Sequence, residues 1–163
     1  MMIQRVQSLW LLFASMSVFL LFFFSIATFS PTNDSMVYGF NFYAFGLDYP
    51  EPFSSALSEL YAPLLKYTVM AVVLVCILTP LFVIFNYKNR SRQMQLSRLT
   101  MLLNVALMVS FFLLTDLFAE KTSTLISYGT GIFVPMGGVV FLLLTIRSIK
   151  KDDKLVRSAD RIR

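Results

Sequence analysis

The residue types that usually carry out chemistry are scarce in this sequence. It has no histidine and one cysteine, Cys76, among 163 residues. A zinc site built from cysteine and histidine, a disulfide framework and catalysis that needs histidine are therefore excluded. Membrane enzymes generally gather acids or histidines at the membrane surface, and no such cluster occurs here. We therefore expect a protein that is not an enzyme and that needs neither a metal nor another cofactor.

Polar and helix-breaking residues inside apolar stretches are the next candidates. Thr79 and Pro80 lie in one such stretch, and Asn104 lies in the following one. A proline frees the carbonyl four residues before it, and a buried amide in lipid needs a hydrogen-bond partner. We expect Asn104 to face a neighbouring helix near Thr79 as a packing contact. In the alternative reading, Asn104 is a ligand for a substrate or an ion.

A small-residue face and a charge pair complete the candidate sites. Gly131, Pro135 and Gly138 are spaced to share one face of a helix, which allows another backbone to approach closely. Lys66 and Asp116 each stand at the end of a helix whose dipole disfavours their charge. Because the two should lie at similar heights on neighbouring antiparallel helices, we expect them to form an ion pair.

Four stretches without charge determine the elements that position these residues. They contain 28, 21, 17 and 25 residues, at 6–33, 67–87, 99–115 and 122–146. About 20 helical residues cross a hydrocarbon core of roughly 30 Å. The chain is 57% hydrophobic and 14% charged, whereas soluble domains are about 45–50% apolar and about 25% charged. The sequence thus predicts an all-α integral membrane protein with four transmembrane helices.

The predicted single domain, residues 1–163, is an up-down four-helix bundle. Twelve of the fourteen basic residues fall in the N-terminus, in the predicted inner loop, and in the tail together with Arg147 at the end of span 4. Because basic segments stay in the cytoplasm, both termini should be cytoplasmic in a multi-pass protein of the bacterial inner membrane. The predicted segments are span 1 (6–29), outer loop (30–63), span 2 (64–87), inner loop (88–98), span 3 (99–118), outer turn (119–125), span 4 (126–149) and tail (150–163).

The first outer loop, about 35 residues long, has room for structure of its own. Aromatic residues alternate along residues 38–43, and Gly46 could turn the chain, which indicates a short β-hairpin. Ser54 or Ser55 could cap a short helix over residues 54–61. The loop then either covers the end of the bundle at headgroup level or offers an aromatic surface to a partner or to lipid.

The tail has the spacing of a short amphipathic cytoplasmic helix. Leu155, Ala159 and Ile162 share one face, and Asp153 stands four residues before Arg157 in the favourable order. The tail is either an anchor on anionic lipid or a docking element for a protein partner. It has no aromatic residue for stacking, so we expect no nucleic acid. The candidate docking residues are Arg5, Asp153, Arg157, Asp160, Arg161 and Arg163.

Both ends of the chain resemble those of a bacterial family of short four-span membrane proteins catalogued as a domain of unknown function. At the start the likeness is carried by Met2–Leu9, which reads MIQRVQSL. Near the other end it is carried by Tyr128-Gly129-Thr130-Gly131 with Pro135, and by Arg147–Arg163, which includes KDDKLVRSADRIR. The resemblance implies an inner-membrane protein with cytoplasmic termini and supplies no activity. It also draws attention to Arg5, which we expect to meet a tail aspartate.

These observations favour a non-enzymatic accessory or scaffold subunit of a larger inner-membrane assembly. Its partners would be membrane lipids and another membrane protein, contacted through the outer loop and the tail, and a second copy of the chain is a further candidate. The alternative is a small transporter or a lipid- or ion-handling protein, in which Thr79, Asn104 and the region of Pro135 line a cavity.

Overall fold

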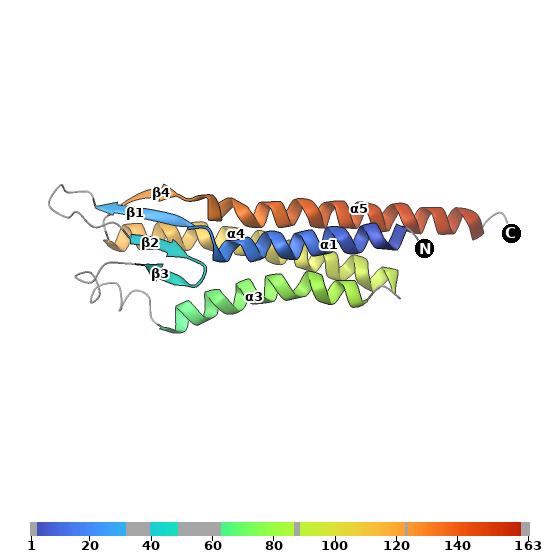
Figure 1. Cartoon of the computed structure of the whole chain (residues 1–163), viewed down its shortest axis with the longest axis horizontal. Coiled ribbons are helices and arrows are strands. Elements are labelled where there is room, and N and C mark those ends of the chain that lie inside the picture. Colours follow the sequence, from blue (N-terminus) through green and yellow to red (C-terminus); the bar gives the residue numbers. More distant parts are fainter. Residues whose placement is uncertain (1–2, 32–39, 49–62, 87–88, 123, 161–163) are drawn as a thin grey trace.

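The structure is a computed structural model that describes residues 3–31, 40–48, 63–86, 89–122 and 124–160 (Figure 1). Four long helices lie side by side in an elongated bundle, and four strands form a sheet at one end of it. We call this end the sheet end, and we call the opposite end, where both termini lie, the terminal end. The helices are α1 (Ile3–Phe19), α3 (Pro63–Phe85), α4 (Arg90–Thr122) and α5 (Val134–Asp160).

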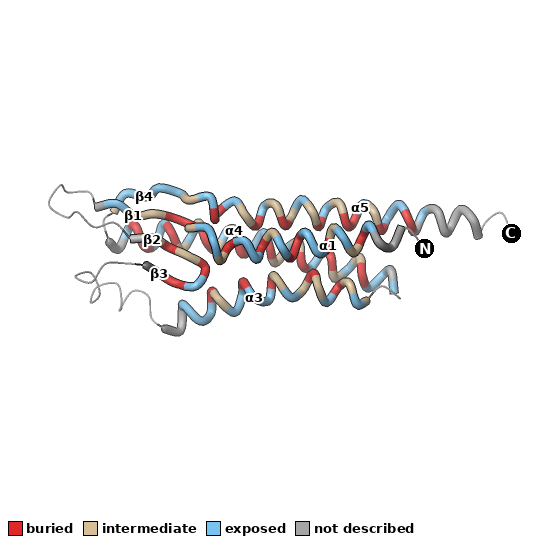
Figure 2. The backbone as a smooth tube through the Cα atoms, in the orientation of Figure 1, coloured by how far each residue is buried: buried red, intermediate tan, exposed pale blue. Residues whose placement is uncertain are grey.

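Every helix buries one seam in which the spacing alternates between three and four residues. Contacts along these seams join α1 to α3 and α5, and α4 to the same two helices. An average spacing of 3.5 residues is typical of left-handed packing in which side chains interdigitate. Figure 2 shows buried positions recurring along each helix. They are Gln7, Leu11, Ala14 and Val18 in α1, with Leu21 in the turn that follows it; Val69, Val73, Cys76, Pro80 and Val83 in α3; Gln93, Ser97, Thr100, Asn104, Leu107 and Phe111 in α4; and Pro135, Gly138, Leu142, Thr145, Ile149 and Asp152 in α5.

The outward faces of the helices are apolar, as a lipid environment requires. Three helical segments of the described chain are long and apolar enough to cross a membrane: Lys66–Phe85, Ser91–Glu120 and Thr130–Asp152. The apolar helix Val6–Phe22 is shorter. The chain is therefore mostly helical with three helices suited to cross a membrane, whereas the sheet corrects the all-α prediction and the first predicted span, 6–29, is longer than the helix that forms.

The first and fourth predicted spans are shorter because the chain leaves helical geometry at the sheet end. Helix α1 ends in a 3₁₀ turn, η1 (Leu20–Phe22), and strand β1 (Ala27–Pro31) follows. On the other side, the residues expected to open span 4 form strand β4 (Thr124–Tyr128), and a second 3₁₀ turn, η2 (Thr130–Phe133), leads into α5.

The sheet contains β2 (Phe40–Tyr43) and β3 (Gly46–Asp48) as well as β1 and β4. Its order is β3-β2-β1-β4, and every neighbouring pair is antiparallel. The expected hairpin forms between β2 and β3, where Gly46 has a φ of +146°, a conformation that side-chain-bearing residues rarely adopt. The short helix expected over residues 54–61 lies outside the described residues.

One face of the sheet packs against the sheet end of α4. The fully buried rings of Phe29 and Phe42 stand edge-on to Phe118, with ring centroids 6.4 and 5.4 Å apart, and Phe42 also contacts Phe111 at 6.2 Å. Each such pair contributes about 0.5–1.5 kcal/mol beyond the burial of its area. Phe42 is thus a core residue at the end of the bundle, which favours the covering role of the outer loop over an aromatic surface offered to a partner or to lipid.

The segments that follow η1 and precede η2 cross at very short range. The backbone N–H of Gly129 donates to the carbonyl of Ile26, and that of Gly131 donates to the carbonyl of Ser25, both at 2.9 Å. A Cβ atom at Gly129 would lie 2.2 Å from the Ser25 oxygen, and one at Gly131 would lie 2.6 Å from it. Both positions therefore require glycine because a second backbone occupies the space of a side chain.

We predict that Gly129→Ala destabilises the protein by about 1–3 kcal/mol or more, because the new Cβ would force two backbones apart. For a chain of this size, each kcal/mol lowers Tm by roughly 2–4 °C. Thermal unfolding in detergent measures the effect, with the exposed neighbour substitution Thr130→Ala as the control. Equal Tm values for the two variants would contradict the crossing.

Candidate functional site

Helix α1 makes three hydrogen bonds to neighbouring helices. The hydroxyl of Ser15 donates to the carbonyl of Ile77 in α3 at 2.9 Å, and that of Ser17 donates to the carbonyl of Val134, the first residue of α5, at 3.0 Å. The amide of Gln7 donates to the Asp152 carboxylate in α5 at 2.5 Å. These contacts bind α1 to both neighbours. The two serines stand two residues apart in an apolar helix, a signal that the sequence analysis did not use.

Buried polar side chains gather in the half of the bundle nearer the terminal end. The hydroxyls of Ser97, Thr100 and Thr145 each donate to the carbonyl four residues earlier in their own helix, at 2.9–3.0 Å. Their donors are therefore used within single helices, while each oxygen keeps the capacity to accept. The opposite half, beneath the sheet, is mainly apolar and contains the larger hydrophobic cluster.

Asn104 is fully buried at the limit of this polar region that lies nearer the sheet end. Its Nδ2 donates to the carbonyl of Thr100 at 2.9 Å, and its Oδ1 has no hydrogen-bond partner among the described residues. A Cβ atom at Gly138 would lie 3.2 Å from this Oδ1 and 3.3 Å from Cγ2 of Val18. Asn104 thus faces α5 beside α1, and the glycine provides the space that its amide needs.

The intramembrane residues singled out from the sequence do not form one site. Gly131, Pro135 and Gly138 are all buried on the inner face of their segment. Thr79 has a buried Oγ1 without a partner among the described residues, so no hydrogen bond joins it to Asn104. We expected Asn104 to face span 2 or another helix near Thr79 rather than lipid, and it is fully buried with Gly138 of α5 as a neighbour.

The predicted ion pair at the sheet end is replaced by other contacts. Asp116 accepts a hydrogen bond from the Tyr128 hydroxyl at 3.1 Å. The Lys66 side chain extends toward the hairpin, with Cε 3.4 Å from the Cβ position of Gly46. No ion pair joins Lys66 to Asp116, both of which the structure describes, because β4 and the hairpin supply each with a nearer neighbour.

Tyr128 is held in its protonated form by its surroundings. Its ring contacts Phe112, with centroids 5.5 Å apart. Partial burial raises the pKa of Tyr128 above its ordinary value, and the hydrogen bond to Asp116 and the negative charge of that carboxylate raise the pKa further. The Tyr128 hydroxyl therefore keeps its proton and donates it in the hydrogen bond to the Asp116 carboxylate at the edge of the sheet.

The tail continues α5 as a helix to Asp160 and projects beyond the other helices at the terminal end (Figure 1). Asp152 is only 7% exposed, whereas Lys150, Lys151 and Lys154 are exposed around it. The expected contact between Arg5 and a tail aspartate stays a prediction, since the Arg5 side chain lies outside the described part. Also outside it are the side chains of Asp153, Arg157 and Asp160 and the whole of Arg161 and Arg163.

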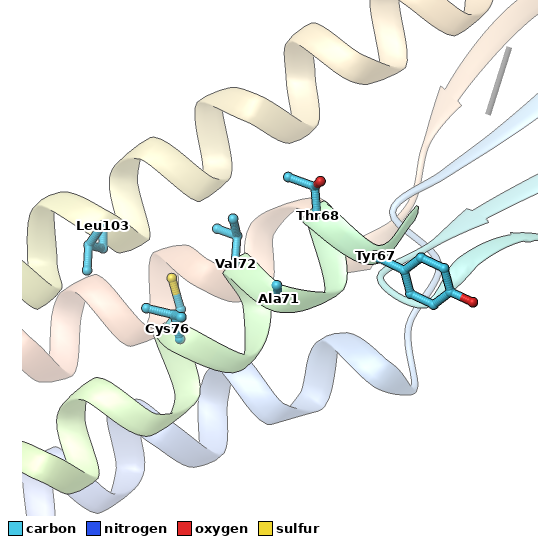
Figure 3. A pocket seen from close by; sticks show the side chains of 7 residues that line it. Tyr67, Thr68, Ala71, Val72, Cys76 and Leu103 are labelled. Carbon is cyan, nitrogen blue, oxygen red and sulfur yellow. The ribbon is translucent and has the colours of Figure 1, made fainter. Parts of the chain in front are cut away.

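An apolar groove of about 440 Å³ opens between α3 and α4 (Figure 3). Its lining includes Tyr67, Thr68, Val72 and Cys76 of α3 and Leu103 of α4. Because the side chains that line it are almost all apolar, the groove fits an acyl chain better than a polar substrate. Within the described residues, no group of three acidic or cysteine side chains could hold a metal ion.

We predict that Asp152→Ala destabilises the protein by about 1.5–3 kcal/mol, because it removes a hydrogen bond to a charged group and leaves the Gln7 amide unpaired. Asp152→Asn keeps an acceptor for Gln7 and should retain most of the stability. The exposed neighbour substitution Lys150→Ala is the control, and Tm in detergent is the measurement. A Tm for Asp152→Ala equal to that of the control would show that the contact does not hold the tail.

The Tyr128–Asp116 contact should also make stability depend on alkaline pH. Because the folded-state pKa of Tyr128 lies above its ordinary value of 10.0, the folded protein keeps a proton that the unfolded chain loses. Stability should therefore fall as the pH rises above about 10. Asp116→Asn should lower the pKa of Tyr128, measured by ultraviolet difference titration. An unchanged titration curve would contradict the contact, and Glu120→Gln serves as the control.

Comparison with known proteins gives one match. No curated protein and no solved structure matches the chain. A family model, by contrast, covers nearly all of it, from the start of α1 to beyond the end of α5, so one family accounts for both the bundle and the sheet. The chain belongs to the family described as domain of unknown function DUF4293, whose model matches residues 3–162.

Proposed function

We propose that the chain is a non-enzymatic, multi-pass protein of the bacterial inner membrane that serves as an accessory or scaffold subunit of a larger membrane assembly. The observation that carries this proposal is the continuity of α5, a 27-residue helix that runs from the bundle interior to Asp160. Because the Gln7–Asp152 contact binds this helix where it leaves the bundle, the charged tail is held in a defined direction. A helix presented in this way suits docking to a protein partner.

Four crossings with both termini in the cytoplasm are part of the proposal. Helix α1 contacts both α3 and α5 along its length, and with η1 it reaches from the terminal end to the sheet, about 30 Å at 1.5 Å per residue. It is therefore a short but sufficient fourth crossing. The placement of the tail in the cytoplasm rests on the twelve basic residues in the N-terminus, in the predicted inner loop, and in the tail together with Arg147.

The packing of the bundle favours a scaffold over a transporter. The buried seams of all four helices are occupied, largely by apolar side chains, and Gly138 brings α5 close to Asn104 and Val18. A transporter remains the second candidate because Asn104 Oδ1 and Thr79 Oγ1 are buried without partners. Oxygens of this kind could receive an ion or a polar substrate group in another state of the bundle.

Purification from native membranes in mild detergent tests the proposal. We expect the tagged protein to retain a specific partner chain, and we expect replacement of Arg157, Arg161 and Arg163 by glutamine to reduce its recovery about tenfold, the effect of about 1.4 kcal/mol. Replacement of the same residues by lysine keeps the charge and is the matched control. A clean monomer or homo-oligomer would contradict the scaffold and favour the transporter.

A further inference from the structure

The two edges of the sheet differ in how well they are protected against pairing with a strand from another chain. Strand β3 has three residues, Gly46–Asp48, and the Lys66 side chain lies against it, with Cε 3.4 Å from the Cβ position of Gly46. Very short edge strands and nearby lysines are common means by which proteins prevent another chain from pairing with a sheet. The β3 edge is therefore closed to a partner strand.

Within the described residues, strand β4 has neither of these protections. Its five residues, Thr124–Tyr128, include no charge and no proline, and they are mostly β-branched, apolar or aromatic. Leu125 is 61% exposed and Tyr128 is 46% exposed. Among the described strands, only β1 pairs with β4. A long, uncharged edge strand of this kind is a template for pairing with another chain.

The register shows which backbone groups β4 leaves open. The Gly129 N–H donates to Ile26, and β4 pairs with β1 so that Ser127 stands opposite Thr28. Because backbone groups of an antiparallel strand alternate in direction, those of Ser127 point toward β1. The N–H and C=O groups of Ile126 and Tyr128 consequently point away from β1, toward the open edge.

The open edge lies near the Asp116 carboxylate, with Glu120 one turn further along α4, and outside the hydrocarbon core. Asp116 and Glu120 are exposed on α4, and β4 packs along this part of α4 through the Tyr128–Asp116 hydrogen bond. Unpaired backbone groups cannot face lipid tails, so the edge lies at headgroup level or in water. A strand added there meets negative charge, which a basic segment would complement.

A second copy of the chain does not suit this edge. Two copies in one membrane share an orientation, and β4 runs roughly along the bundle axis (Figure 1). Their β4 strands would therefore run parallel, and a two-fold rotation cannot supply the stagger that parallel pairing needs. The second copy would also bring the carboxylates of its own Asp116 and Glu120 to the contact.

We infer that the open edge of β4 binds an extended, basic segment of another protein, which adds to the sheet as a fifth strand. The main-chain groups of Ile126 and Tyr128 provide the hydrogen bonds, and Asp116 and Glu120 select the basic segment. This inference rests on the proposed scaffold function and names the kind of contact that the subunit makes at its sheet end.

The test uses the full chain in nanodiscs of phosphatidylcholine, whose neutral headgroups do not attract a basic peptide. The probe is a short fluorescent peptide of alternating valine and threonine with lysine at both ends. We expect it to bind, as measured by fluorescence anisotropy. We expect the same peptide with alternate backbone nitrogens methylated to bind about tenfold more weakly or worse, because it cannot complete the main-chain hydrogen bonds.

Two matched variants test the edge from the side of the protein. Ile126→Pro removes an N–H that points away from β1, so the ladder between β1 and β4 keeps its bonds, whereas Ile126→Val retains the N–H. We expect only the proline variant to weaken peptide binding, by about tenfold or more. Replacing both Asp116 and Glu120 by their amides should also weaken binding and reduce its dependence on salt. Tm reports whether each variant is folded.

Three results would overturn the inference. The first is equal binding of the methylated and unmodified peptides, and the second is no binding of either peptide up to about 1 mM. The third is a disulfide-linked dimer of Leu125→Cys in a Cys76→Ala background, which would make a second copy the occupant. If the peptide fails while a partner still co-purifies through the tail, the inference about β4 is wrong and the scaffold stands.

Discussion

The cost of leaving buried polar groups unpaired in the absence of water constrains most of this structure. Apolar contact alone binds helices weakly in lipid, so close packing and hydrogen bonds between helices carry much of the specificity. Helix α1 is the shortest of the four, yet Ser15 binds it to α3, and Gln7 and Ser17 bind it to α5. Its place in the bundle is therefore fixed by three polar contacts, each of which would be costly to leave unpaired.

The same constraint explains why the sheet forms only at one end. A backbone that leaves helical geometry in lipid must be paired at once, and the segments beside η1 and η2 achieve this by pairing with each other through Gly129 and Gly131. The long helix α4 then provides the surface on which the sheet packs, through Phe111 and Phe118. The two glycines, the strands and the long α4 thus together allow the backbone at this end of the bundle to leave helical geometry while staying hydrogen-bonded.

The sequence was informative about class and less informative about where helices end. Apolar stretches predict membrane helices, and Gly46 with its alternating aromatic residues predicts the hairpin that β2 and β3 form. Strands β1 and β4 were missed because their residues continue apolar stretches, in which composition cannot distinguish a strand from a helix. The neighbour of Asn104 was also beyond prediction, since it depends on how α4 and α5 rotate against each other.

The distribution of polar groups gives the two ends of the bundle different properties. At the terminal end, polar side chains are buried within the helices, and Asp152 is held between them, so the tail leaves the bundle from a fixed point. At the sheet end, the side chains beneath the sheet are mainly apolar, and the contact that we infer uses the backbone of the edge strand β4. A side-chain contact can discriminate by charge and shape, whereas a backbone edge accepts many sequences and relies on neighbouring charges for selection. In the proposed scaffold, the tail helix would therefore be the selective contact and the β4 edge the permissive one.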